Sequence, residues 1–483
     1  MRRLMTFVCV VLFSLTAAGC ADVGSNESSS TSGTGITGQA AIFTPSDQLE
    51  LSQNVPLGTW AKFVPEMKTS LINAGFSKTS ISTTTSGTLE DQSSAVQDAV
   101  VSSVSSSSKT SDVTTLVVAP VPASGENDAK FGDFVSRSYS REANSTSASS
   151  TSSSKTNTAL ARLADALELA QQSGIRVIIV ANKIPGFTPD LFLQMSSAAM
   201  IGEIQAKNLV TKLQLDSASS ARPRVIEVLL PESKSNGFNR QFFSGIWSVL
   251  KPYFVNGKAV SASGTLTSST TVADWKSVTF DATTPTAAGD EIYQRLTKKL
   301  SASTSSKVTT PEIDGIIASN DFVVSGVVKK LTKMGYTGSS AQINPSISVS
   351  GIVEGIIGKR DIQRSAVPDP SASSSKKSTT TNDSQWPIIT GYGANIATLP
   401  DIVNGHLWMT TIEDRGNAAT LLSRVCAAWA KGKKVTSVAG VKTSTYYTTS
   451  VPTIDAGLVA ISADNLKTTL IDKGYASLSD AGL

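Results

Sequence analysis

The sequence predicts an α/β protein made of two doubly wound parallel-sheet lobes joined by a hinge. Short apolar runs without polar alternation are typical of strands that are buried on both faces of a parallel sheet. Amphipathic helical patterns separate these runs along most of the chain, which is the order of βα units. These units are too many for one small sheet, so we expect the 483 residues to form two lobes.

The first lobe is expected to begin its regular alternation of helix and strand at about residue 59. Apolar residues at helical spacing predict the helices, and Gly75 is a plausible stop for the first of them. The predicted helices cover residues 60–74, 93–104 and 158–174. The predicted buried strands cover residues 114–121 and 175–182.

The same alternation is expected to continue along the chain after a helix over residues 192–213. The predicted strands that follow cover residues 224–230, 258–266, 313–321, 386–393 and 406–414. The predicted helices that follow cover residues 239–254, 288–300, 323–336, 396–405 and 416–432.

Each lobe is expected to draw on two separate parts of the chain. The N-terminal lobe is predicted to contain residues 39–197 and 393–432, and the C-terminal lobe residues 198–392 and 445–483. Two serine-rich inserts, residues 123–157 and 365–385, interrupt the lobes. Their low complexity predicts mobile segments outside the packed core.

The N-terminus reads as a secretory signal peptide that ends in a lipidation site. Residues 1–20 contain Arg2 and Arg3, then an apolar core too short to span a bilayer, then "TAAGC". That ending looks like a bacterial lipobox with Cys20 as the lipidated residue, although an ordinary cleavage site is the alternative. Residues 21–38 lack a core-forming pattern and predict a disordered tether. We therefore expect an extracytoplasmic protein that is anchored to the cell membrane.

Composition argues against several classes of function. A formal net charge of +4 over this length gives no concentrated basic stripe for nucleic acid. His406 is the single histidine, and Cys426 is the one cysteine beyond the leader, so neither a histidine-rich metal site nor a disulfide within the lobes is expected. Since no motif pairs a nucleophile with a base, we expect no enzyme activity and no cofactor.

Seven stretches follow one another in an order and spacing that resemble a known family. They are "FVPEMKTSLINAGF", "LELAQQSGIRVIIVANKI", "FFSGIWSVLKPYFVNGKAVSASG", "IDGIIASND" followed by "LTKMGY", "PIITGYGA" and "DNLKTTLIDKGY". Together they resemble the extracytoplasmic sugar-binding proteins of ABC importers, of the galactose, xylose and multiple-sugar type, which have the type I periplasmic-binding fold. The resemblance runs from about residue 40 to the C-terminus, apart from the inserts. It implies a monomer that binds a sugar between its lobes and delivers it to a transporter permease.

The resemblance also implies an altered ligand pocket. Family members commonly end the strand before the hinge in Asp-Arg, where this chain has Asn182 and Lys183. Both can still hydrogen-bond a sugar, but the bidentate geometry is lost, and a solvated strand end is the alternative. An Asp-Asn pair of the family is replaced by Ser197 and Ala198, and a later Asp by Gly393.

Other positions retain polar or aromatic groups. In the loop "PESKSNGFNR", Asn236, Asn239 and Arg240 could face the ligand, or could simply form a polar loop at a helix start. Asn320 follows an apolar strand, as in the family, and could bind ligand or cap the next helix. For each of these residues, ligand binding and a structural role at a helix start both stay open as interpretations.

Two aromatic residues complete the predicted ligand set. Tyr392 could offer a ring or a hydroxyl beside Gly393. Trp60 could stack on a sugar, but packing in the lobe core is the more common role of such a residue. The sequence thus predicts a lipid-anchored receptor for a sugar or a similar small polar ligand. The alternative is a surface lipoprotein of the same fold whose pocket has degenerated and which acts as a sensor or an interaction partner.

Overall fold

The structure is a computed structural model in which the described residues begin at Ile36. They are residues 36–47, 56–105, 113–122, 130–137, 139, 150–233, 236–298, 311–340 and 384–483. The chain divides into residues 1–34 and a compact unit from Gly35 to Leu483, and the fold below is that of the second unit. The predicted leader, its Cys20 and most of the tether lie outside the described residues, as does much of both inserts.

One sheet contains seven strands in the order β14-β15-β5-β4-β3-β1-β2. All neighbouring pairs are parallel except β14 with β15. The strands are β1 (Gly38–Pro45), β2 (Ile81–Ser86), β3 (Val113–Val118), β4 (Arg176–Val180), β5 (Leu191–Gln194), β14 (Val441–Tyr446) and β15 (Thr449–Asp455).

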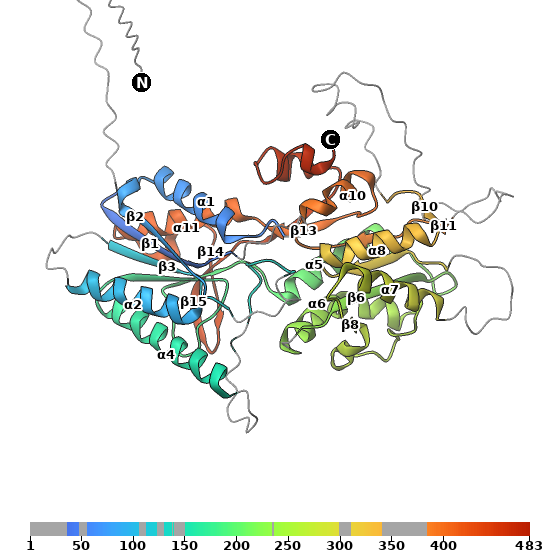
Figure 1. The fold of residues 1–483 in the computed structure, drawn as a ribbon, viewed down its shortest axis with the longest axis horizontal. Helices are drawn as coiled ribbons and strands as arrows, with labels where there is room; N and C mark the ends of the chain where they lie inside the picture. The colour runs from blue at the N-terminus through green and yellow to red at the C-terminus, as the bar shows by residue number, and fades with distance from the viewer. Residues whose placement is uncertain are drawn as a thin grey trace, which may run out of the picture. The chain divides into compact units, whose positions relative to one another are not determined.

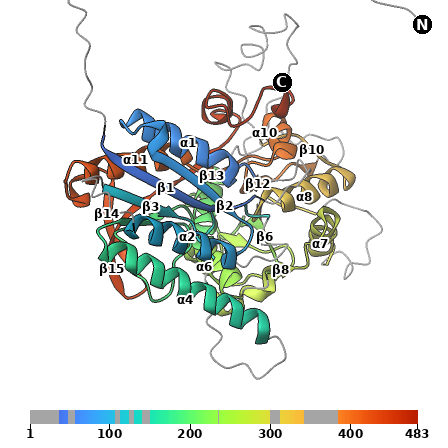
Figure 2. The same cartoon turned by 60° about the vertical axis from the view of Figure 1, so that its left-hand side comes forward.

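Helices cover both faces of this first sheet. Figures 1 and 2 show α1 (Trp60–Asn73) and α11 (Arg415–Ala430) on one face, and α2 (Leu89–Ser105) and α4 (Ser150–Gln172) on the other. Strand β4 contributes to both cores. Its Ile178 and Val180 pack in the cluster with α1 and α11, whereas its Val177 and Ile179 pack in the cluster with α2 and α4. Alternate residues of a strand point to opposite faces, which explains the unbroken apolar run.

The second sheet is also parallel and is covered on both faces. Its order is β7-β6-β9-β12, and a further short strand, β8, pairs with β6. The strands are β6 (Arg224–Pro231), β7 (Ala259–Val260), β8 (Thr279–Phe280), β9 (Gly315–Ala318) and β12 (Ile388–Thr390). The helices are α5 (Ala198–Lys212), α6 (Asn236–Val255), α7 (Pro285–Thr297) and α8 (Asp321–Lys333).

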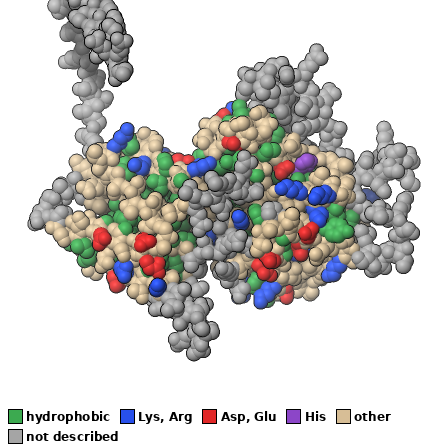
Figure 3. All heavy atoms as spheres, in the orientation of Figure 1, with side chains coloured by type: hydrophobic (Ala, Val, Ile, Leu, Met, Phe, Trp, Pro, Cys, Tyr) green, Lys and Arg blue, Asp and Glu red, His purple; other side chains and the backbone are tan. Residues whose placement is uncertain are grey.

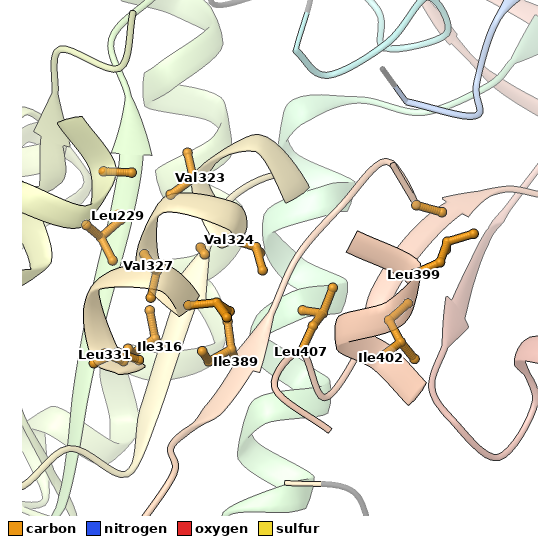
Figure 4. Close-up of a cluster of buried hydrophobic side chains, with 14 of the residues drawn as sticks. Leu229, Ile316, Val323, Val324, Val327, Leu331, Ile389, Leu399, Ile402 and Leu407 are labelled. Atoms are coloured by element: carbon orange, nitrogen blue, oxygen red, sulfur yellow. The ribbon is translucent and has the colours of Figure 1, made fainter. Parts of the chain in front are cut away.

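The core on the α8 face of this sheet is continuous with the C-terminal part of the chain. Figure 4 shows side chains of the strands beneath α8, and side chains from α10 (Leu399–Asn404) and its following turn beside them. The labelled side chains are Leu229, Ile316 and Ile389 from strands, Val323, Val324, Val327 and Leu331 from α8, and Leu399, Ile402 and Leu407. Each is buried. The same cluster includes Leu466, Leu470 and Tyr475 near the C-terminus.

The chain passes between the two sheets at three places. Residues 195–197 connect β5 to α5, residue 414 connects β13 (Thr410–Glu413) to α11, and residues 456–457 connect β15 to β16 (Leu458–Ile461). Strands β13 and β16 pair with each other in an antiparallel fashion. Two parallel sheets with helices on both faces and three crossings confirm the predicted fold class.

The remaining elements are short. They are β10 (Tyr336–Thr337), β11 (Ser384–Gln385), the 3₁₀ helices Lys78–Ser80, Val272–Val278, Ile396–Thr398, Val435–Ser437 and Ser479–Ala481, and a π-helix over Lys467–Ile471. No helix among the described residues has the length and apolar character needed to cross a membrane. On the face drawn in Figure 3, basic and acidic side chains are interspersed.

Several elements differ from the sequence-based expectation. Residues 192–194 belong to strand β5 and not to the helix predicted there. The strands β1, β2, β14, β15 and β16 were not predicted. Residues 445–455 lie in the first sheet, because β15 pairs with β5, whereas the sequence assigned them to the C-terminal lobe. The insert 123–157 was expected to be mobile throughout, yet its residues 130–137 are packed.

Candidate ligand site

Residues 130–137, here called the bridging segment, contact residues that lie beside the first sheet and residues that lie beside the second. On the side of the second sheet, the ring of Phe131 lies 5.0 Å from Phe238 and 5.5 Å from Phe242 between ring centroids. The Tyr392 ring is 6.2 Å away, just beyond the end of β12. Lys130 Nζ lies 4.9 Å from the centroid of Phe322, in the first turn of α8.

The same segment is bonded to the first sheet and to a crossing. The Ser136 hydroxyl donates to the carbonyl of Ala181 (2.7 Å), and the Arg137 N–H donates to Asn182 Oδ1 (2.8 Å). Both acceptors directly follow β4. The Ser136 N–H donates to the carbonyl of Ser196 (2.9 Å), in the connection from β5 to α5.

These contacts bring the bridging segment to the ends of several strands. The segment thus contacts residues that follow β4 in one sheet. Around the other sheet it contacts Tyr392 after β12, Phe322 in the first turn of α8, and two rings of α6, the helix that follows β6. Ligands of open α/β sheets bind beyond the carboxyl ends of the strands, where the chain order reverses. The region occupied by the bridging segment is therefore the candidate ligand site.

Two carboxyl groups meet at the start of α1. The Trp60 N–H donates to Asp47 Oδ1 (3.0 Å) and to Asp133 Oδ2 (3.1 Å), and the Ala61 N–H donates to Asp47 Oδ2 (2.8 Å). Burial, followed by the hydrogen bond and charge of Asp47, raises the pKa of Asp133 to about 7. The carboxyl of Asp133 thus changes its charge near neutral pH while the segment is packed.

Asn182 lies at the candidate site, but both ends of its amide are used within the protein. Its Oδ1 accepts from Arg137, its Nδ2 donates to the carbonyl of Pro120 (3.0 Å), and its side chain is buried. The neighbouring Lys183 turns to the sheet edge instead. Its Nζ donates to the carbonyl of Thr445 (2.9 Å) and lies 5.3 Å from the ring centroid of Tyr446. Burial lowers the pKa of Lys183.

The two predicted aromatic residues are both buried. Trp60 packs edge-on against Phe134 of the bridging segment, with ring centroids 5.0 Å apart, and belongs to the core of the first lobe. Tyr392 donates its hydroxyl to Glu413 Oε1 (2.5 Å), which also accepts from the Ser196 hydroxyl. Burial raises the pKa of the Tyr392 phenol well above its usual value and also raises that of the Glu413 carboxyl.

The predicted polar residues of the second lobe are distributed around the starts of α6 and α8. Asn320 caps α8, since its Oδ1 accepts from the Val323 N–H (3.0 Å). Asn236 is the first residue of α6, and Arg240, one turn later, is exposed. Asn239 is buried, and its Nδ2 donates to the carbonyl of Pro231 (3.3 Å).

Several buried polar atoms beside these strand ends have spare hydrogen-bonding capacity. Asn320 Nδ2, Ser319 Oγ and Asn239 Oδ1 have no hydrogen-bond partner among the described residues. Ser319 and Asn320 directly follow β9, and Asn239 lies against the end of β6. A buried amide or hydroxyl without a partner is costly, and each of these groups could bond a ligand hydroxyl. In the described part of the chain, no group of acidic, histidine and cysteine side chains could hold a metal ion.

The three substituted family positions have structural roles. The hydroxyl of Ser197 accepts from the Met200 N–H at the start of α5, and Ala198 is buried. Gly393 has a φ of +117°, which favours glycine. A Cβ at this position would lie 2.9 Å from Asn395 Oδ1 and 3.3 Å from Pro56 Cβ. An aspartate therefore does not fit at residue 393 in this conformation.

Sequence reasoning missed the bridging segment and the roles of Asp321 and Glu413. Both residues lie inside stretches predicted only as strands, 313–321 and 406–414. The signal for the bridging segment was present: "KFGDFV" places two phenylalanines and a valine inside a stretch that is otherwise rich in serine.

Comparison with known proteins gives structural neighbours only. No protein-family model matches the chain, and no curated protein matches it in sequence. An ABC-transporter solute-binding protein from Clostridium phytofermentans with bound β-D-glucose is 19% identical over 92% of this chain and 99% of its own, with a TM-score of 0.49. A carbohydrate-transporter solute-binding protein from Chloroflexus aurantiacus in complex with D-glucose is 17% identical over 91% and 97%, with a TM-score of 0.48. An arabinose-binding protein from Geobacillus stearothermophilus is 9% identical over 90% of this chain and 99% of its own, with a TM-score of 0.47. These neighbours are of the class that the sequence resembles.

Proposed function

We propose that this protein is an extracytoplasmic solute receptor that captures a sugar, or a similar small polar molecule, between its two lobes. The observation that carries the proposal is the convergence of strand ends. Residues beyond β4 and residues beyond β6, β9 and β12 approach one region from both sheets. Beside the ends of β6 and β9, buried amide and hydroxyl groups retain hydrogen-bonding capacity, which suits a ligand rich in hydroxyl groups.

The proposal includes a membrane anchor and a transporter partner. The lipobox-like sequence at Cys20 supports attachment by lipid, and residues 21–38 would hold the lobes away from the membrane. A receptor of this kind acts as a monomer without catalysis, and an ABC permease receives its ligand. Closure of the lobes about the three crossings is the motion expected on binding.

Isothermal titration of the full-length protein with a panel of mono- and oligosaccharides tests the ligand class. We expect heat and a raised melting temperature with at least one sugar. Asn320→Ser should weaken that binding about tenfold, because serine keeps an acceptor for the cap but removes the free Nδ2 donor. Its melting temperature without sugar should stay near that of the wild type.

The control is Ser197→Thr, which retains a hydroxyl at the cap of α5 and lies outside the unpartnered group. It should bind the same sugar with wild-type affinity. The absence of heat with every sugar would reject the sugar assignment.

A second candidate function is a surface lipoprotein with the same fold that binds no sugar. The observation that favours it is the internal use of predicted ligand groups. Both ends of the Asn182 amide are bonded within the chain, and Lys183 is directed to the edge of the first sheet. Absence of a transporter permease gene beside the gene for this protein would support it.

A further inference from the structure

We propose that the bridging segment is a built-in occupant of the candidate ligand site, docked there in the free protein and released when ligand enters. The inference rests on the proposed function in one respect, since it takes the region between the strand ends as the ligand site. The docking itself is argued from contacts that any ligand class would have to displace.

Two phenylalanines dock the segment in two separate cores. Phe131 is buried in the cluster that lies between the second sheet and helices α5 and α6. Phe134 is buried in the cluster formed by the first sheet with α1 and α11. One short segment therefore closes against both lobes, as a ligand held between them would.

The backbone of the segment is also hydrogen-bonded at two places, just before α1 and in the connection from β5 to α5. The Asp133 N–H donates to the carbonyl of Gly58 (3.0 Å), and the Ser136 N–H donates to that of Ser196 (2.9 Å). Val135 forms a parallel bridge with Ser196. These bonds fix the register of the segment, so its position is specific and not a general collapse of apolar side chains.

The segment also takes up hydrogen-bonding capacity at the predicted ligand residue Asn182. The Arg137 N–H occupies Asn182 Oδ1, the atom that would otherwise accept from a ligand hydroxyl. A ligand that used Asn182 would have to replace this bond. Binding and undocking are thus linked through a shared acceptor.

Titration of Asp133 gives the docked segment a dependence on pH. Its carboxyl faces Asp47 from the chain beyond β1, Arg137 from its own segment and the N–H of Trp60 from α1. Burial and Asp47 outweigh Arg137 and the N–H, so docking raises the pKa from 3.8 to about 7. Protonation therefore favours docking. The stabilisation of the docked segment by protonated Asp133 is fully present below about pH 4, decreases as the pH rises, and is lost above about pH 7.

Hydrogen exchange of the backbone amides of Asp133, Ser136 and Arg137 in the full-length protein tests the docking, because each is bonded only when the segment is in place. The variant Phe131→Ala should raise their exchange rates at least tenfold. Phe254→Ala is the matched control, since Phe254 belongs to the same core cluster but lies at the far end of α6. This variant should be less stable overall, but the exchange rates of these three amides should stay close to those of the wild type.

The pH arm uses the same amides after correction for intrinsic exchange. In the wild type, the equilibrium constant for opening at these amides should increase with pH between about 4 and 7, by no more than about tenfold per pH unit. Asp133→Asn should remove that slope, and Asp98→Asn, which changes an exposed carboxylate on α2, should retain it. Intrinsic exchange rates in the wild type at pH 5, or rates that Phe131→Ala leaves unchanged, would overturn the docking.

Failure of this inference is distinguishable from failure of the proposed function. If a sugar binds by calorimetry and these amides stay protected in the complex, the segment is not an occupant, while the receptor function stands. If no sugar binds but the amides respond to Phe131→Ala and to pH, the docked segment stands and the sugar assignment fails.

Discussion

Replacing Asp321 with alanine should lower the free energy of unfolding by about 3–5 kcal/mol. The Asp321 carboxylate is fully buried and accepts from Thr410 Oγ1 (2.8 Å), Thr398 Oγ1 (2.9 Å) and the Asn395 N–H (3.1 Å). It thereby joins α8, the loop after β12 and strand β13. Alanine would leave these buried donors without their acceptor and would open a void beside Gly391.

Denaturant unfolding at pH 8 measures this effect. Burial raises the pKa of Asp321 to about 6, so the carboxylate is ionised in the folded protein at that pH. Asp321→Asn keeps one acceptor and should lower the free energy of unfolding by clearly less than alanine does. Asp98→Asn, at an exposed residue, should change it by less than about 0.5 kcal/mol. A loss below about 1 kcal/mol for Asp321→Ala would contradict the role assigned to this carboxylate.

Replacing Glu413 with alanine should cost about 2–4 kcal/mol of unfolding free energy. Glu413 ends β13, one residue before the crossing to α11. Its buried carboxylate accepts from Ser196 at another crossing and from Tyr392 after β12. Its removal leaves two buried hydroxyl groups without this acceptor, at the point where the connections between the lobes meet.

A graded series separates this network from a general effect of losing a glutamate. Ser196→Ala removes one of the two donors and should cost about 1 kcal/mol. Glu203→Ala removes a partly exposed carboxylate that pairs with Lys207 within α5, and should lower the free energy of unfolding by about 0.5 kcal/mol or less. Equal losses for Glu413→Ala and Glu203→Ala in thermal unfolding would show that the network at the crossings contributes little.

The fold class was predictable because the central strands of both sheets, such as β4 and β9, are buried on both faces. The run at residues 177–180 is continuous for that reason, and its side chains divide between two cores. Edge strands lack this signal. Four of the six residues of β2 are exposed threonines or serines, and among the described strands β14 pairs with β15 alone. Strand β5 has four residues, so its apolar run merged with the pattern of the following helix.

The sequence indicates which polar residues follow the strands, but not what those residues contact. Asn182 and Asn320 come just after β4 and β9, as the apolar runs before them indicate. Sequence position could not show that a segment of the same chain would reach Asn182, because that contact joins residues 45 positions apart. Nor could it show the orientation of Lys183, which depends on a hairpin more than 260 residues later.

Calorimetric titration of the wild type and of Phe131→Ala with the same sugar panel tests the central claim most directly. A receptor whose site is held by its own segment predicts that at least one sugar binds both proteins. It also predicts a severalfold lower Kd for Phe131→Ala, because less binding energy is used to undock the segment. Heat from neither protein, with both shown to be folded by their melting transitions, would contradict the account.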